Sequence, residues 1–137
     1  DEKTNKDISI INVTEDNVTL MDSFWASIQK KYSVIGKRDA QYFIWRYIKM
    51  PRRDYLIYAA VEKGAPVGYI VGRKCEVAGM QCGMIVDFLI SPRREVAGEL
   101  LLKKIVNYFR CEKIGLLGCL MQPEIEEALI LKKKMVI

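Results

Sequence analysis

The sequence predicts one α/β or α+β domain over residues 1–137, built as a mixed sheet flanked by helices. Strand-like and helix-like periodicities alternate along the chain in the order β-α-α-β-β-β-α-β-α. Residues 84–90 are apolar except for Asp87, which indicates a strand covered on both faces. A long amphipathic segment, 93–110, separates this strand from the apolar run 114–121, as a parallel crossover requires.

The first third of the chain is expected to supply one strand and two helices. Residues 8–13 are short and rich in β-branched side chains, which favours a strand. Apolar side chains then recur at steps of three and four from 18 to 32, the pattern of an amphipathic helix. A second helix is expected over 39–48, and Pro51 prevents it from continuing.

The middle of the chain is expected to form an antiparallel meander of strands 55–61, 67–73 and 84–90. A hairpin turning at Ala78 and Gly79 places Cys75 opposite Cys82, with Cα atoms ~5.5 Å apart. A disulfide is within reach of that geometry. The chain opens with charged residues and not with a signal peptide, so we expect a cytoplasmic protein with reduced thiols.

Strand 114–121 and a last helix that starts at Pro123 complete the expected order. Three glutamates lie in the first turn of that helix and three lysines in its last turn, which suits the helix dipole.

Composition excludes several chemistries. The chain has no histidine, so it contains neither a Ser–His nor a Cys–His nucleophilic pair, and its four cysteines lack zinc-site spacing. We therefore expect no metal. No apolar run approaches the ~20 residues of a membrane span, so no membrane partner is expected. The formal net charge of +5 permits an anionic partner without requiring one.

The strand, loop and helix over residues 84–110 resemble the central unit of the GNAT superfamily, the acyl-CoA-dependent N-acyltransferases. Residues 38–47, with Pro51 and Tyr55, look like the second helix of a GNAT subgroup with a Trp-Arg-Tyr sequence there. Residues 68–71 look like that family's third strand and 87–92 like its fourth. The resemblance covers nearly the whole chain and implies acetyl-CoA, or another acyl-CoA, as co-substrate and an amine as acceptor.

Three departures from the family pattern affect what the resemblance implies. The family's glycine-rich pyrophosphate loop is replaced by residues 93–98, where Gly98 alone remains and Glu95 adds negative charge. Lys132 stands where the family has its usual general acid, a tyrosine. The sequence also stops before the family's last two strands, so the domain is expected to be truncated at its C-terminus.

The candidate catalytic residues are Asp87 and Lys132. Asp87 is a candidate general base, because burial in an apolar strand disfavours the charged form of a carboxyl group. The alternative is a structural carboxylate paired with Arg46 or with backbone donors, and this alternative carries more weight because buried charges are usually paired. Lys132 or water would protonate the leaving thiolate. For Trp45, a place in the core is favoured over a place in an acceptor groove.

The candidate acyl-CoA site combines strand 4 with the loop and helix that follow it. The amides of the strand would hold the thioester and pantetheine, and the helix N-terminus would hold the pyrophosphate. The residues are Phe88, Leu89, Ile90, Arg93, Arg94, Val96 and Gly98. For the two arginines, we give equal weight to two interpretations: a clamp for phosphate, and solvent-exposed side chains at the start of the helix.

Three function classes remain. The first, which we favour, is an acyl-CoA-dependent N-acyltransferase. The second is a GNAT-fold binding or scaffold domain without catalysis, which the altered loop and the missing tyrosine favour. The third, a nucleic-acid-binding module, is the weakest because no nucleic-acid motif accompanies the charge. Formation of a homodimer is left open.

Overall fold

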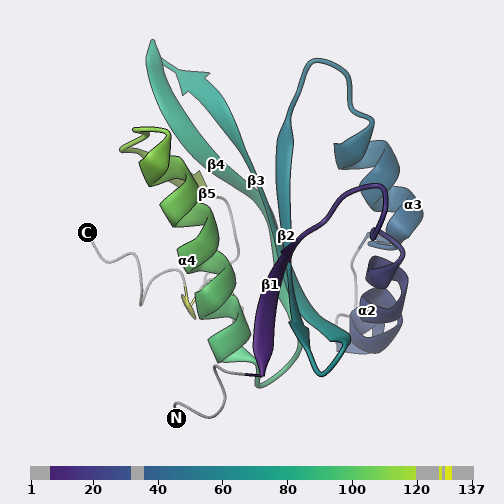
Figure 1. The fold of residues 1–137 in the computed structure, drawn as a ribbon. Helices are drawn as coiled ribbons and strands as arrows, with labels where there is room; N and C mark the ends of the chain where they lie inside the picture. The colour runs from purple at the N-terminus through teal and green to yellow at the C-terminus, as the bar shows by residue number, and fades with distance from the viewer. Residues whose placement is uncertain (1–6, 32–35, 120–126, 128, 131–137) are drawn as a thin grey trace.

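The computed structural model describes residues 7–31, 36–119, 127, 129 and 130. One five-stranded sheet lies between helix α4 on one face and helices α2 and α3 on the other (Figure 1). The strands are β1 (Ile8–Asn12), β2 (Tyr55–Glu62), β3 (Ala65–Val77), β4 (Met80–Ile90) and β5 (Leu117–Cys119). The helices are α2 (Leu20–Ile28), a 3-10 turn η1 (Gln29–Lys31), α3 (Ala40–Phe43), a π-helical turn η2 (Ile44–Ile48) and α4 (Glu95–Cys111).

The sheet order follows the chain, β1-β2-β3-β4-β5. The first four strands pair antiparallel with their neighbours, and β5 pairs parallel with β4. The predicted meander and the parallel crossover through α4 are therefore confirmed. No helix in the part of the chain that the structure describes is long and apolar enough to cross a membrane.

Several element bounds differ from the sequence-based expectation. The arms of the β3–β4 hairpin run on to Val77 and Met80, because backbone pairing continues where the side chains become exposed and lose a clear apolar pattern. Strand β5 begins only at Leu117, not at residue 114. Residues 120 and 121 and most of the expected last helix lie outside the described residues, although 127, 129 and 130 are helical.

The two faces of the sheet carry separate hydrophobic clusters, since alternate strand residues point to opposite faces. Ile70, Phe88 and Ile90 pack with α4 in one cluster. Tyr69 and Leu89 pack with α2 and α3 in the other. Asp87 has the same strand parity as Leu89, and its side chain therefore lies on the α2–α3 face.

Strand β4 contains a β-bulge at Val86. Val71 on β3 is opposite Asp87, whereas the next residue, Gly72, is opposite Ile85. One extra residue on β4 thus interrupts the ladder and changes which backbone groups face β3 beyond it. This bulge determines the orientation of the strand end that the site uses.

The segment 39–48 begins as predicted, but it does not continue as a single α-helix. The carboxylate of Asp39 caps α3 by accepting from the amide of Tyr42 at 3.0 Å, and Asp22 of α2 accepts from the amide of Ala40 at 2.9 Å. Four residues later the helix widens into η2. Trp45 is 68% exposed, so the prediction of a core position was wrong. Phe43 and Tyr47 take the buried positions of this segment instead.

Cys75 and Cys82 lie opposite each other on β3 and β4, as the turn count predicted, and both are free thiols. We expect alkylation of the protein from cells under non-reducing conditions, followed by mass spectrometry, to find all four cysteines blocked. The expectation rests on the cytoplasmic location inferred from the sequence, because a reducing compartment keeps such a pair as thiols. A cross-linked peptide containing residues 75 and 82 would contradict this expectation.

Candidate functional site

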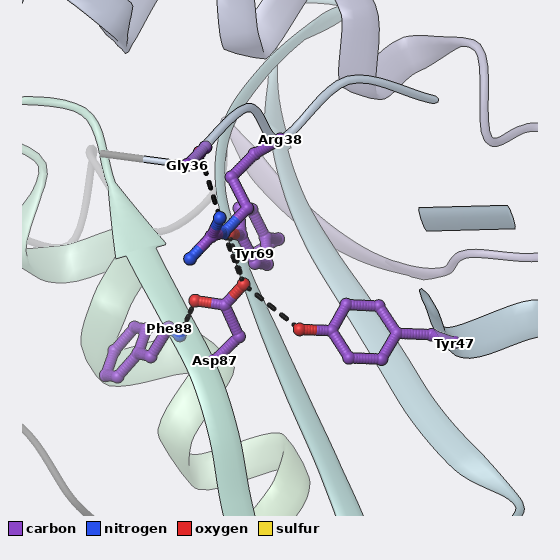
Figure 2. Close-up of polar contacts among 6 residues, drawn as sticks. All are labelled: Gly36, Arg38, Tyr47, Tyr69, Asp87 and Phe88. Carbon is purple, nitrogen blue, oxygen red and sulfur yellow. Dashed lines mark hydrogen bonds and ion pairs between the residues drawn. The ribbon is translucent and has the colours of Figure 1, made fainter. Parts of the chain in front are cut away.

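The carboxylate of Asp87 is the centre of a polar cluster on the α2–α3 face (Figure 2). Its Oδ2 accepts from the phenol of Tyr69 at 2.7 Å, from Arg38 Nε at 3.0 Å and from the phenol of Tyr47 at 3.3 Å. Its Oδ1 accepts from the backbone amide of Phe88 at 3.1 Å. Three separate elements thus converge on one carboxylate: the segment before α3, the turn η2 and strand β3.

The protonation of the partners fits this arrangement. Burial raises the pKa of Tyr69, and the nearby charge of Asp87 raises it further. The pKa of Tyr47 is raised by the same two causes in the same order. Burial lowers the pKa of Arg38, but the negative charge of Asp87 and the neighbouring tyrosines outweigh that effect and the pKa is raised. Both phenols and the guanidinium therefore keep their protons and act as donors toward the carboxylate.

Of the two partners expected for a structural Asp87, the backbone donor is present in the amide of Phe88, whereas the expectation of Arg46 was wrong. Its Nη1 donates to the hydroxyl of Tyr55 at 3.2 Å. Arg38, which lies 49 positions before Asp87, supplies the pairing cation. The widened turn η2 carries both Arg46 and Tyr47, and it is Tyr47 that it presents to Asp87.

The second part of the site is the end of β4 that follows the bulge. The amide of Ser91 donates to Val67 on β3, so odd-numbered residues of this stretch face β3. The amides of Phe88 and Ile90 face the opposite side, toward the β5 edge. There Phe88 is bonded to Asp87 Oδ1, and Ile90 is bonded to Glu127 Oε1 at 2.9 Å. Among the described contacts, side-chain carboxylates accept from both amides.

The loop between β4 and α4 is the third part. Arg93 has a left-handed φ of 63°, a conformation that glycine adopts more easily. Arg94 Nε pairs with Glu62 of β2 at 2.8 Å. The amides of Arg94 and Gly98 bond to Ser91 and Arg94 carbonyls, respectively. The amides of 95–97 are the ones that the helix itself leaves for an anion.

Close packing explains why a glycine stands at position 98 of α4. A Cβ at this position would lie 2.8 Å from Ile130 Cδ1 and 3.3 Å from Ile90 Cδ1. Its missing side chain lets α4, β4 and the C-terminal helical residues approach closely. Val96 is half-buried on the same helix.

A hollow of about 440 Å³ lies next to the Asp87 cluster, lined by Lys37, Asp39, Gln41, Tyr42 and Trp45. Arg38 connects the two: its Nε donates to Asp87, and its guanidinium lies 4.8 Å from the centre of the Tyr42 ring, which lines the hollow. The exposed indole of Trp45 forms part of the wall. The hollow therefore combines flat aromatic surface with charged and amide groups.

The sequence-predicted residues meet only in part. Asp87, Phe88 and Ile90 share one strand end, where Phe88 and Ile90 offer backbone groups because their side chains are buried. Leu89 is buried on the other face. Lys132 lies outside the described residues. Among the described residues, no group of three Cys, Asp or Glu side chains could hold a metal ion.

Sequence reasoning missed Arg38, Tyr47, Tyr69 and Glu127. One signal was present for Tyr69, since a tyrosine among buried strand positions needs a partner for its hydroxyl.

No family model and no curated protein matches the sequence. Solved structures do match the fold. An aminoglycoside acetyltransferase from an uncultured soil metagenomic sample has a TM-score of 0.71 at 10% identity, covering 97% of this chain and 90% of its own. Ribosomal-protein-alanine N-acetyltransferase from Brucella melitensis biovar Abortus 2308 has a TM-score of 0.71 at 10% identity, with coverages of 95% and 92%. A transcriptional regulator from Bacillus halodurans C-125 has a TM-score of 0.69 at 14% identity, with coverages of 95% and 92%. The chain therefore has the fold of the GNAT acetyltransferases.

Proposed function

We propose that the protein is an acyl-CoA-dependent N-acyltransferase that moves an acetyl or other acyl group to an amine acceptor. The observation that carries the proposal is the end of β4, where the bulge turns the amides of Phe88 and Ile90 away from β3. Both amides already donate to carboxylate oxygens, so they suit the carbonyl oxygens of a thioester and its pantetheine. Amides held rigidly in a strand stabilise the oxyanion of acyl transfer without reorganisation.

The transfer needs one proton acceptor and one proton donor. The neutral amine attacks the thioester carbon, a C–N bond forms and the C–S bond breaks. Asp87 is the proposed acceptor of the amine proton. Among the described contacts, three donors reach its Oδ2 and one reaches Oδ1, which leaves room on Oδ1 for a further partner. Lys132 or water is the proposed source of the proton for the thiolate.

The acceptor is proposed to enter through the hollow beside Tyr42 and Trp45, because this hollow adjoins the Asp87 cluster. The names of the two acetyltransferase neighbours give different acceptors, an aminoglycoside and an alanine of a ribosomal protein. These names support an amine as the acceptor, but they do not indicate which class of amine it is.

A second candidate function, a binding domain without catalysis, is favoured by the loop. Arg94 is already paired with Glu62, Arg93 takes a glycine-like conformation, and the carboxylate of Glu95 lies in the first turn of α4. The pairing of Arg94 and the negative charge of Glu95 both weaken a pyrophosphate site. The two candidates differ in whether acyl-CoA binds.

Acetyl-CoA is expected to raise the melting temperature of the protein, and Glu95→Gln is expected to strengthen the effect. The substitution removes a negative charge from the anion site and keeps a good helix former. At about 100 times its Kd, a ligand adds ~2.7 kcal/mol to the free energy of unfolding. The measurement is a thermal-shift titration with acetyl-CoA, longer acyl-CoAs and CoA.

The matched control is Glu76→Gln, which makes the same charge change at an exposed position of the β3–β4 hairpin. Its titration should coincide with that of the wild type. If none of the acyl-CoAs shifts the melting temperature of any variant, the binding-domain candidate replaces the transferase.

A further inference from the structure

Glu127 is a fully buried carboxylate at the edge of the sheet. Its side chain is 0% exposed, and its Oε1 accepts from the amide of Ile90 at 2.9 Å. This amide is one of the two that the bulge in β4 turns toward the β5 edge. The described part of β5 pairs with residues 83–85 of β4, so the contact with Glu127 lies beyond the paired region.

The position of Glu127 is fixed by its neighbour one helical turn later. Ile130 is 4% exposed and belongs to the cluster that α4 forms with β4. Residues three apart lie on the same face of a helix, so Ile130 and Glu127 face the sheet together. Leu129, on another face, is exposed. The absence of a side chain at Gly98 makes room for Ile130 and so holds the helical residues against the strand end.

We propose that Glu127 is an internal competitor of the acyl-CoA: its carboxylate occupies the Ile90 amide that a carbonyl oxygen of the substrate must reach. The inference rests on the proposed function. A carboxylate oxygen and a thioester or amide carbonyl oxygen are the same kind of hydrogen-bond acceptor, and one N–H cannot serve both well. Substrate binding therefore requires Glu127 to withdraw, and the carboxylate lowers the affinity for acyl-CoA.

Two substitutions separate the acceptor from its charge. Glu127→Ala removes the acceptor and should tighten acetyl-CoA binding about tenfold, which corresponds to ~1.4 kcal/mol, about one hydrogen bond. Glu127→Gln keeps an amide oxygen for Ile90, so its affinity should stay within about threefold of the wild type. Isothermal titration calorimetry of the intact protein with acetyl-CoA measures both, with Glu76→Gln as the control for charge.

Hydrogen exchange at the Ile90 amide reports on the contact itself. The protection of the Ile90 amide from exchange should fall in Glu127→Ala and persist in Glu127→Gln. In Glu127→Ala it should return when acetyl-CoA is added. In the wild type, saturating acetyl-CoA should change the NMR shift of the Glu127 carboxyl carbon, because the carboxylate loses the hydrogen bond from the Ile90 amide. This measurement needs no variant, so it stands even if Glu127→Ala does not fold.

The outcomes distinguish the competition from the function on which it rests. Equal affinities of the wild type and Glu127→Ala, or an unchanged Glu127 carboxyl shift in the saturated wild type, would overturn the competition while the transferase proposal stands. If the Ile90 amide is equally protected from exchange in Glu127→Ala and in the wild type, the hydrogen bond between Ile90 and Glu127 is not the one that protects it, and the proposal fails. If Ile90 loses protection in Glu127→Ala and neither protein binds acyl-CoA, the transferase proposal fails, and the competition with it.

Discussion

Asp87→Asn is expected to lower the free energy of unfolding by about 2–3 kcal/mol and to abolish acyl transfer. An asparagine side chain has a single acceptor oxygen, and its NH₂ group is a donor. Arg38, Tyr47 and Tyr69 all donate to Asp87 Oδ2. If the asparagine oxygen takes the Oδ2 position, its NH₂ group meets the Phe88 amide, which loses its acceptor; in the other orientation the three side-chain donors lose theirs. The loss is smaller than for a fully buried pair, because the side chains of Arg38 and Asp87 remain 22% and 11% exposed. Urea denaturation and a transfer assay well below the melting temperature measure the two effects.

A matched control separates the network from the chemistry. Tyr47→Phe removes the longest of the side-chain contacts to Asp87, at 3.3 Å, and should cost about 0.5–1.5 kcal/mol while transfer is kept. A double-mutant cycle of Asp87→Asn with Arg38→Met should show a coupling energy above about 1 kcal/mol. If Asp87→Asn loses transfer without losing stability, Asp87 acts as the base alone; if it keeps both, the carboxylate has neither role.

Gly72→Ala is expected to destabilise the protein by about 1–3 kcal/mol through overpacking. A Cβ at this position of β3 would lie 2.4 Å from Ile105 Cδ1 of α4, 3.2 Å from the carbonyl oxygen of Met84 and 3.3 Å from Phe109 Cζ. The Ile105 side chain must therefore move aside, and the backbone and the ring on the other two sides leave little room for the new methyl group. Chemical denaturation measures the loss.

Ile105→Val removes the methyl group that Gly72→Ala meets first, so the double variant should recover part of the stability. Gly115→Ala is the control: within the described structure nothing lies within 4 Å of its Cβ, and the change should stay within about 0.5 kcal/mol. Equal losses at both glycines would show that close packing is not the cause.

Periodicity was enough to predict the β2–β3–β4 meander and the parallel pairing of β5 with β4, because the antiparallel partners follow one another in the chain and a long helix precedes β5. The turn at Ala78 and Gly79 likewise determined that Cys75 faces Cys82. The pairing of β1 with β2 was not predicted. The bulge at Val86 was not predicted, because one extra apolar residue in an apolar run does not change the hydrophobic pattern of the sequence. Yet this residue decides which amides of β4 face outward.

The partners of Asp87 could not be read from the sequence. Arg38 and Arg46 are both arginines near the second helix, and the choice between them depends on how that helix turns. The widening at η2 changes the angular position of every later side chain, which places Trp45 outside and Tyr47 inside. The contact between Glu127 and Ile90 joins a helix to a strand end, and no periodic pattern records such a contact.

The order of the strands also bears on folding. The pairs from β1 to β4 join neighbours in sequence, whereas β5 reaches β4 only across the whole of α4. Contacts between distant segments form late, because closing the long loop between them costs conformational entropy before the stabilising contacts are made. In a partly folded chain, the β5 side of β4 is thus an open edge, and open edges pair with other chains. When Glu127 bonds to the Ile90 amide, it covers one backbone donor of that edge. We therefore expect the same carboxylate to reduce pairing of the partly folded protein with other chains.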